Sequence, residues 1–314
     1  MKQTTNSILM IRPINFRMNE QTAVNNYYQR VLDDLLPATV NVNAQKEFDD
    51  YVKKLESHGV HVIVISDIEG SDTPDAIFPN NWISFHENVD VALYPMFAEN
   101  RRLERREDIL DLLEERGFKI ENIVDYTSAE ADNVFLEGTG SVLLDRVNNK
   151  AYCAISDRAN EELFIEFCED FEYTPVLFSA YQTVHDKRKK IYHTNVMMCI
   201  GETFAVLCLA CIDNKKQRQN LIKHLHDDGK KIIEISEDQV NHFAGNMLQL
   251  KGAEADSYLV MSQSALNSLL PAQIKLIESH ATIISSPLET IETCGGGSAR
   301  CMMAEVFLPS NPSI

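Results

Sequence analysis

The chain alternates strand-like and helix-like segments from one end to the other, and this order limits the available folds more than any other feature of the sequence. Two strand-like segments, an amphipathic helix-like segment and a third strand-like segment recur at intervals of about sixty residues, without obvious identity between copies. Residues 141–181 form one copy, with a hairpin expected at Asn148 and Asn149. Residues 195–236 form another, with a turn expected at Gly201. The pattern predicts an α/β domain built from several such units.

The remaining segments continue this order without a domain boundary. No stretch rich in proline, glycine or serine divides the chain, so we expect residues 1–314 to form a single domain. The charged segment 99–117 has the spacing of one exposed amphipathic helix, and residues 76–85 are typical of a strand. Further strands are expected at residues 7–13, 60–66, 89–96, 119–126, 246–252 and 257–262, and further helices at residues 44–59 and 271–280.

The charge and the apolar runs of the chain exclude several classes of function. A formal net charge of -18 argues against a nucleic-acid partner, because phosphates would be repelled. The apolar run near the N-terminus has the length of neither a signal-peptide core nor a membrane span of roughly 20 residues, so no membrane association is expected. Seven cysteines, scattered through apolar segments, favour a reducing compartment over a disulfide framework. We therefore expect a soluble, cytoplasmic protein.

A run of three glycines lies immediately upstream of a cysteine near the end of the chain. The segment reads GGGSARCMMAEVF, with Gly295 to Gly297 followed by Cys301 and then by an apolar stretch typical of a buried strand. Adjacent glycines suit positions with φ > 0 or a close approach of the backbone to another group. We interpret the run as a bend that presents Cys301 at the edge of a cavity, as a candidate nucleophile.

Three other short segments place polar residues beside apolar strands, where packing alone does not need them. A thiolate, an imidazole that moves a proton and a carboxylate that orients the imidazole are the parts of an activated thiol system. Spacing alone does not establish that such residues meet in the fold. The residues are Asp75, Asn80 and Asn81 in PDAIFPNNW, Glu137 in FLEGTG, and His193 and Asn195 in IYHTNV.

Taken together, these segments resemble the guanidino-group-modifying enzymes of the pentein superfamily, which includes arginine deiminases, dimethylarginine dimethylaminohydrolases and glycine amidinotransferases. The resemblance runs from DAIFPNN to GGGSARCMM and is nearest to the amidinotransferase-like citrulline hydrolases, or ureidases. It implies a five-bladed α/β propeller with pseudo-fivefold symmetry and a site in its central channel. It further implies a small amino-acid substrate and no metal or organic cofactor.

The resemblance also assigns roles to individual residues. Cys301 would be the nucleophile, His193 the general acid and base, and Glu137 the carboxylate beside the histidine. Arg158, in AISDRAN, would bind the α-carboxylate of the substrate, since a guanidinium holds a carboxylate with two parallel hydrogen bonds. Arg102 is a second candidate for that role.

The chain departs from arginine-directed relatives at three of the polar positions. Asn80 and Asn81 stand where those relatives have acidic residues, and Asn195 stands where arginine deiminases have aspartate. A carboxylate suits a cationic guanidinium, whereas an amide offers both a donor and an acceptor to a neutral ureido group. The amides therefore favour citrulline, which would be hydrolysed to ornithine, carbon dioxide and ammonia.

Other interpretations of these residues stay open at this point. Transfer to an amine, hydrolysis of a guanidino compound and a non-catalytic, partner-binding pentein are the alternatives to citrulline hydrolysis. Without the resemblance, His193 is typical of a strand end, and the asparagine pair is typical of a turn. Cys208 and Cys211 have a C-x-x-C spacing but lie in an apolar segment, so we interpret them as packing residues. The oligomeric state and the physiological pathway are not encoded in any recognisable pattern.

Overall fold

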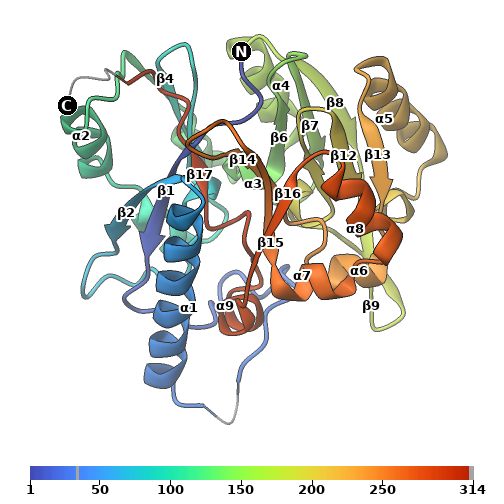
Figure 1. Ribbon diagram of the computed structural model, residues 1–314. Helices are drawn as coiled ribbons and strands as arrows, with labels where there is room; N and C mark the ends of the chain where they lie inside the picture. The colour runs from blue at the N-terminus through green and yellow to red at the C-terminus, as the bar shows by residue number, and fades with distance from the viewer. Residues whose placement is uncertain (33–34, 311–314) are drawn as a thin grey trace.

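The computed structural model describes residues 1–32 and 35–310, which form a mixed α/β fold (Figure 1). Among these residues, five sheets have three strands each and share one pairing pattern, in which the middle strand is antiparallel to one neighbour and parallel to the other. In sheet order the strands are β17 (Ala304–Glu305), β1 (Ser7–Arg12) and β2 (His61–Ser66); β3 (Ile83–Phe85), β4 (Asp90–Leu93) and β5 (Asn122–Asp125); β6 (Val142–Asp145), β7 (Lys150–Ala154) and β8 (Thr174–Phe178); β11 (Met198–Ile200), β12 (Phe204–Leu207) and β13 (Lys231–Glu234); and β14 (Leu248–Lys251), β15 (Ser257–Ser262) and β16 (Thr282–Ser286).

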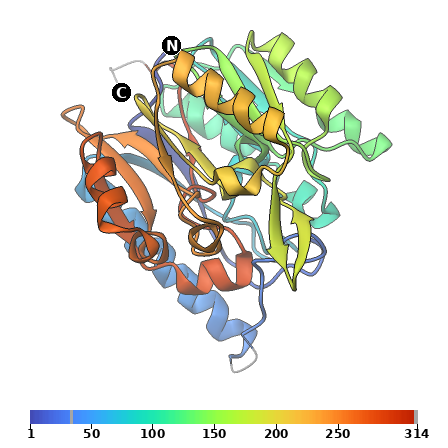
Figure 2. The same ribbon diagram turned by 90° about the vertical axis from the view of Figure 1, so that its right-hand side faces the viewer.

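Each parallel pair is joined by a crossover that contains a helix, as parallel strands require. The longer helices lie on the outside of the molecule, with the strands toward its middle (Figures 1 and 2). Four of these crossovers complete the predicted order of two strands, a helix and a strand along the chain, whereas the first joins β1 to β2 in a sheet whose third strand is β17. The helices are α1 (Pro37–Ser57), α2 (Asp108–Glu115), α4 (Glu161–Asp170), α5 (Lys215–Asp227), and α7 (Gln263–Ser268) with α8 (Pro271–Glu278); the shorter ones elsewhere are α3 (Gly138–Ser141), α6 (Glu237–Asn241) and α9 (Glu289–Gly295).

The first sheet is completed by the opposite end of the chain. Leu9 of β1 pairs with Ala304 of β17, while the other edge of β1 is parallel to β2. Phe48 and Tyr51 of α1 pack in one apolar cluster with Met302 and Met303, the residues that follow the candidate nucleophile. The C-terminal segment is therefore held in place by the N-terminal sheet and its helix.

Local sequence signals account for where the helices begin and end. Asn160 precedes α4 and accepts the N–H of Leu163 through its side chain (3.0 Å), which satisfies one of the unpaired donors of the first turn. The chain leaves α1 through Gly59, at φ +78°. A Cβ at Gly59 would lie 2.6 Å from the backbone nitrogen of Ala253, so both the conformation and the close approach require glycine.

Two predicted elements are wrong in extent. The charged segment 99–117 is not one helix: a 3₁₀ helix (Glu99–Glu104) is followed by a break and then by α2. The reason is that Arg101 and Glu104 are buried as an ion pair (2.9 Å), so this part of the segment is not an exposed face. Only residues 83–85 of the segment 76–85 form a strand, because Pro79 begins a 3₁₀ turn (Pro79–Asn81), a position where its missing N–H is tolerated.

Three further segments refine the predictions. Cys208 and Cys211 are buried free thiols, as predicted, but Cys208 precedes a 3₁₀ turn (Leu209–Cys211) and Cys211 ends it, so the segment does not continue as a strand. The apolar stretch after Cys301 is buried, although only β17 pairs with a neighbour. The sequence does not predict the projecting hairpin of β9 (Tyr181–Val184) and β10 (Lys187–Lys190), because its second strand is wholly charged and lacks apolar alternation (Figures 1 and 2).

Within the described residues, no helix is long and apolar enough to cross a bilayer.

A buried lysine connects two neighbouring sheets. The Lys230 ammonium, just before β13, donates to Asp145 at the end of β6 (3.1 Å) and to the carbonyls of Gly201 and Glu202 in the β11–β12 turn (2.9 and 3.0 Å). Both ionised side chains are almost fully buried. Such a pair is costly to break from one side, because the remaining charge is left without its partner.

We predict that Lys230→Met lowers the free energy of unfolding by about 3 to 5 kcal/mol, because Asp145 is left as an uncompensated buried charge. Lys231→Met is the matched control, since the adjacent lysine is exposed. Urea unfolding of both variants checks the prediction. Equal midpoints for the two variants would contradict it.

Candidate active site

Polar residues lie in the short segment that leads into the first strand of each sheet unit. The 3₁₀ turn with Asn80 and Asn81 precedes β3, Glu137 precedes α3 and β6, and His193 precedes the 3₁₀ turn Thr194–Val196 and β11. Asn246 stands two residues before β14, and Cys301 stands three residues before β17. The segments that lead into five first strands therefore supply the polar residues of the site.

Several of these segments meet around a small pocket. Cys301 and His193 line it together, as do Asp75, Asn81 and Arg158. Gly295 and Gly297 of the predicted bend also line it, as do four residues that the sequence analysis did not select, namely Asn26, Phe78, Arg101 and Tyr192.

Glu137 and His193 form a buried pair behind the pocket. The Nε2 of His193 lies 2.7 Å from Oε2 of Glu137, and both side chains are at most 2% exposed. A carboxylate only accepts hydrogen bonds, so Nε2 carries the proton and Nδ1 of the neutral ring is the unprotonated nitrogen. The other oxygen of Glu137 accepts the backbone N–H of Phe97 (3.0 Å).

The surroundings keep the carboxylate ionised and the imidazole neutral. Burial alone would raise the pKa of Glu137, but Arg158, His193 and Arg101 outweigh it and lower that pKa to about 2. Burial lowers the pKa of His193 to about 4, although Glu137 acts in the opposite direction. At neutral pH the ring is therefore unprotonated at Nδ1 and able to accept a proton.

Gly140 allows this pair to approach the turn that carries Asn81. A Cβ at this position would lie 2.4 Å from Nδ2 of Asn81 and 2.9 Å from Nδ1 of His193. Real Cβ atoms do not approach so closely, so any larger residue would displace one of the two side chains. This close approach explains the second glycine of FLEGTG.

The Cys301 sulfur accepts hydrogen bonds from two amides. Asn195 donates from Nδ2 at 3.3 Å and Asn246 donates from Nδ2 at 3.2 Å. With its amide oriented to satisfy both ends, Asn80 donates to the carbonyl of Cys301 (2.6 Å) and accepts the N–H of Gly140 (3.3 Å). The glycine run provides the bend, with α9 ending at Gly296 in the left-handed region (φ +62°).

Of two adjacent arginines, the one that the sequence analysis did not select faces the pocket. Arg101 is 2% exposed and donates from Nη1 to Oδ1 of Asn81 (2.8 Å). Arg102 does not line this pocket; it lies beside Glu130 (3.5 Å) and donates to the carbonyl of Met96. The dipeptide sequence contains no signal that distinguishes them, because the choice depends on how the 3₁₀ helix packs.

Arg158 lines the pocket, but its donors are already occupied. Its Nε and Nη2 donate to Oδ1 of Asn25, and Nη2 also donates to the carbonyl of Thr22 (2.9 Å). Its Nη1 lies 3.5 Å from Glu137, and its guanidinium lies 4.8 Å from the ring centre of Tyr192. The segment that contains Thr22 and Asn25 therefore lies over the expected carboxylate-binding residue.

Asp75 contributes a carboxylate with one unoccupied oxygen. Its Oδ2 accepts from Asn19 (2.8 Å) and Thr22 (3.1 Å), while Oδ1 is buried without a hydrogen-bond partner among the described residues. Burial raises the pKa of Asp75, although Arg101 acts in the opposite direction. An unpaired, buried acceptor in a pocket is suited to a donor from a ligand.

The comparisons with known proteins can be set beside this geometry. Residues 12–308 match the sequence model of the eukaryotic N,N-dimethylarginine dimethylhydrolase family. No curated protein sequence matches the chain.

Similar solved structures include an arginine dihydrolase, ArgZ, from the ornithine-ammonia cycle in cyanobacteria, with 17% identity and a TM-score of 0.73. The match covers 98% of this chain but only 42% of ArgZ, so the chain spans about two fifths of that protein. The ArgZ N-terminal domain, bound covalently to a reaction intermediate in one structure, is covered to 99%, against 96% of this chain, with 16% identity and a TM-score of 0.69. A dimethylarginine dimethylaminohydrolase, as an adduct with S-methyl-L-thiocitrulline, has 14% identity, a TM-score of 0.63, and coverage of 95% of this chain and 98% of that one.

We predict that the buried His193 makes stability pH-dependent between pH 6.5 and 4. Its pKa falls from 6.5 in the unfolded chain to about 4 in the folded one, so the unfolded state binds more protons in this interval and stability decreases as the pH decreases. His193→Asn should reduce this loss by up to about 3 kcal/mol, since one pKa unit corresponds to about 1.4 kcal/mol. Urea unfolding at several pH values measures it. His226→Asn, which changes an exposed histidine of α5, should behave as wild type, and a similar slope in both variants would exclude the effect.

Proposed function

The chain belongs to the dimethylarginine dimethylhydrolase family of guanidino-modifying pentein enzymes, and from this premise we propose that it is a cysteine-dependent hydrolase that cleaves a C–N bond at the ureido carbon of citrulline. The relatives named above act on guanidino groups, so the narrower choice of citrulline rests on this chain's own residues. The proposed products are ornithine, carbon dioxide and ammonia. Residues 1–314 would act as one catalytic domain.

The observation that carries the proposal is the neutral polar environment of Cys301. Two amides donate to its sulfur, a third faces its carbonyl, and the fourth, Asn81, lines the same pocket. Among the described residues, no carboxylate is hydrogen-bonded to the thiol or to any of these amides. Because Arg101 occupies Oδ1 of Asn81, its Nδ2 remains as a donor. A carbonyl oxygen of a ureido group needs such a donor, whereas a guanidinium has no acceptor for it.

We propose a two-step reaction for Cys301 and His193, which line the same pocket. His193 takes the thiol proton at Nδ1, and the Cys301 thiolate attacks the ureido carbon. His193 then gives the proton to the departing δ-nitrogen, and ornithine leaves while a carbamoyl thioester remains on the sulfur. In the second step His193 takes a proton from water, whose oxygen attacks the carbonyl carbon and breaks the C–S bond, and the thiol is reprotonated. The carbamate that is released decomposes to carbon dioxide and ammonia.

We extend the proposal to the arrangement of the sheets. The five equivalent sheets would be the blades of a five-bladed α/β propeller, with the site in its central channel. The common pairing pattern of the sheets, the completion of the first sheet by β17 and the location of the polar residues in the segments before five first strands support this arrangement.

Arg158 is proposed to bind the α-carboxylate of the substrate. For this, the carbonyl of Thr22 and the side chain of Asn25 would have to release its Nε and Nη2, which are aligned for a bidentate contact. The distance of Arg102 from the pocket lining makes it the weaker candidate for this role.

Hydrolysis of a guanidino compound is the second candidate function. The family match favours it, and so does Asp75, whose unpartnered oxygen could accept from a guanidinium. Turnover of arginine or dimethylarginine in preference to citrulline would favour this second function.

We predict that Cys301→Ser reduces kcat by at least about a thousandfold, because a neutral hydroxyl replaces the only nucleophile in the proposed mechanism. Cys211→Ser, which changes a buried thiol outside the pocket lining, should retain most of the activity. Steady-state ornithine release from citrulline measures both variants. Near-normal turnover by the Cys301 variant would refute the mechanism.

Asn81→Asp tests the substrate class directly. The new carboxylate replaces the donor that Nδ2 offers to the ureido oxygen, so kcat/KM for citrulline should fall by roughly tenfold to a hundredfold. The values for arginine and dimethylarginine should fall less, because a guanidinium tolerates the negative charge. The measurement is kcat/KM for all three compounds in wild type and variant. An equal loss for all of them would separate Asn81 from substrate discrimination.

A further inference from the structure

We propose that Asn246 positions Cys301 for the reaction and stabilises its thiolate form; this inference rests on the proposed function for its catalytic consequence, although not for its effect on the thiol. Asn246 lies in the segment that leads into β14, two residues before that strand, and Cys301 lies three residues before β17. It is 1% exposed and outside every motif that the sequence analysis selected.

Asn246 connects three parts of the site through one amide. Its Nδ2 donates to the Cys301 sulfur (3.2 Å) and to the carbonyl of Asn195 (3.1 Å). Its Oδ1 accepts the backbone N–H of Arg300 (3.0 Å). The side chain therefore joins the sulfur, the peptide that precedes the nucleophile and the turn that follows His193.

These contacts determine which way the amide faces. A backbone N–H is only a donor, so Arg300 fixes Oδ1 on its own side and leaves Nδ2 facing the sulfur. A donor aimed at sulfur stabilises the anion more than the neutral thiol, because hydrogen bonds to charged acceptors are stronger. The amide of Asn246 is consequently arranged to favour the thiolate.

The backbone around Asn246 is held rigidly. Phe243 has φ +62°, and its carbonyl accepts a hydrogen bond from the backbone N–H of Asn246 (2.9 Å), which closes the turn. A Cβ at Gly245 would lie 2.3 Å from the carbonyl oxygen of Val196, so this glycine lets the turn press against the segment after His193. Asn246 thus reaches the sulfur from a fixed backbone.

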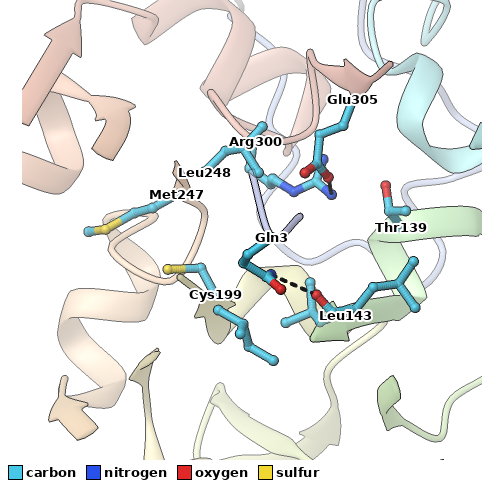
Figure 3. Close-up of a pocket in the computed structure, with 10 residues that line it drawn as sticks. Gln3, Thr139, Leu143, Cys199, Met247, Leu248, Arg300 and Glu305 are labelled. Atoms are coloured by element: carbon cyan, nitrogen blue, oxygen red, sulfur yellow. Dashed lines mark hydrogen bonds and ion pairs between the residues drawn. The ribbon is translucent and has the colours of Figure 1, made fainter. Parts of the chain in front are cut away.

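The residues adjacent to Asn246 and Cys301 in the sequence, Met247 and Arg300, face a second pocket. This pocket is small, and Figure 3 shows Arg300 directed toward Glu305 there. Arg300 pairs with Glu305 (3.1 Å) and donates to the carbonyl of Met303 (2.9 Å). Arg300 is therefore held both by Asn246, through its backbone N–H, and by Glu305 and Met303, through its side chain.

Asn195 and Asn246 differ in their freedom to serve the substrate. The Oδ1 of Asn195 is buried without a partner among the described residues, so that amide can still bind a ligand group. Both ends of the Asn246 amide are occupied by protein. Asn246 is accordingly a positioning residue rather than one that touches the substrate.

The test is the pH dependence of Cys301 alkylation, which needs no substrate. Iodoacetamide reacts with the thiolate, and trypsin cleavage after Arg300 releases residues 301–314, a peptide with one cysteine, for mass spectrometry. In Asn246→Asp an oxygen can still accept from Arg300, but the group facing the sulfur becomes negative. We expect the midpoint of the pH–rate curve to rise by about one unit or more, and turnover of citrulline at neutral pH to fall at least tenfold. Asn246→Ser, which lacks the reach of the amide, should shift the midpoint less.

Asn267→Asp is the matched control, because it makes the same charge change at an exposed position. Circular dichroism identifies any variant that does not fold. An unchanged alkylation midpoint in folded Asn246→Asp and Asn246→Ser would overturn the inference. If the midpoint shifts while wild type turns over none of the tested citrulline or guanidino compounds, the proposed function fails and the effect of Asn246 on the thiol remains.

Discussion

The buried charge of Glu137 is the interaction on which the rest of the site depends. A carboxylate with no solvent exposure is costly unless it is compensated, and here one histidine, two arginines and a backbone N–H surround it. Arg158 extends this network to the segment with Thr22 and Asn25, and Arg101 extends it to Asn81. One charge thereby fixes the imidazole tautomer, the neighbouring amide and the segment that lies over the pocket.

The site separates its charges from its nucleophile. Carboxylates lie behind His193 and beside the N-terminal segment, whereas amides surround Cys301. This separation is the physical basis for proposing a neutral group at the sulfur and a charged amino-acid backbone farther away. Asp75 is the exception, because its free oxygen faces a pocket that could also hold a cation.

Residues 19–26 of the N-terminal segment contact side chains and backbone that line the pocket. Asn19 and Thr22 bind Asp75, Asn25 binds Arg158, and Asn26 donates to the carbonyl of Gly295 (3.3 Å). Short polar side chains thus occupy Asp75 and Arg158, two groups that the proposed function assigns to the substrate.

The sequence by itself determined the repeated unit and most of the polar positions of the site. The alternation of apolar strand-like segments with segments of helical spacing is a local property, so the sequence predicts the order of strands and helices. Short motifs likewise point to Cys301, His193 and Glu137. Only the tertiary structure decided which of Arg101 and Arg102 faces the pocket, that the charged segment 99–117 breaks in two, and that Asn246 contacts the sulfur. These outcomes depend on packing between units that are distant along the chain. Local spacing contains no information about that packing, because burial and partner choice are set by contacts between segments that are far apart in the sequence.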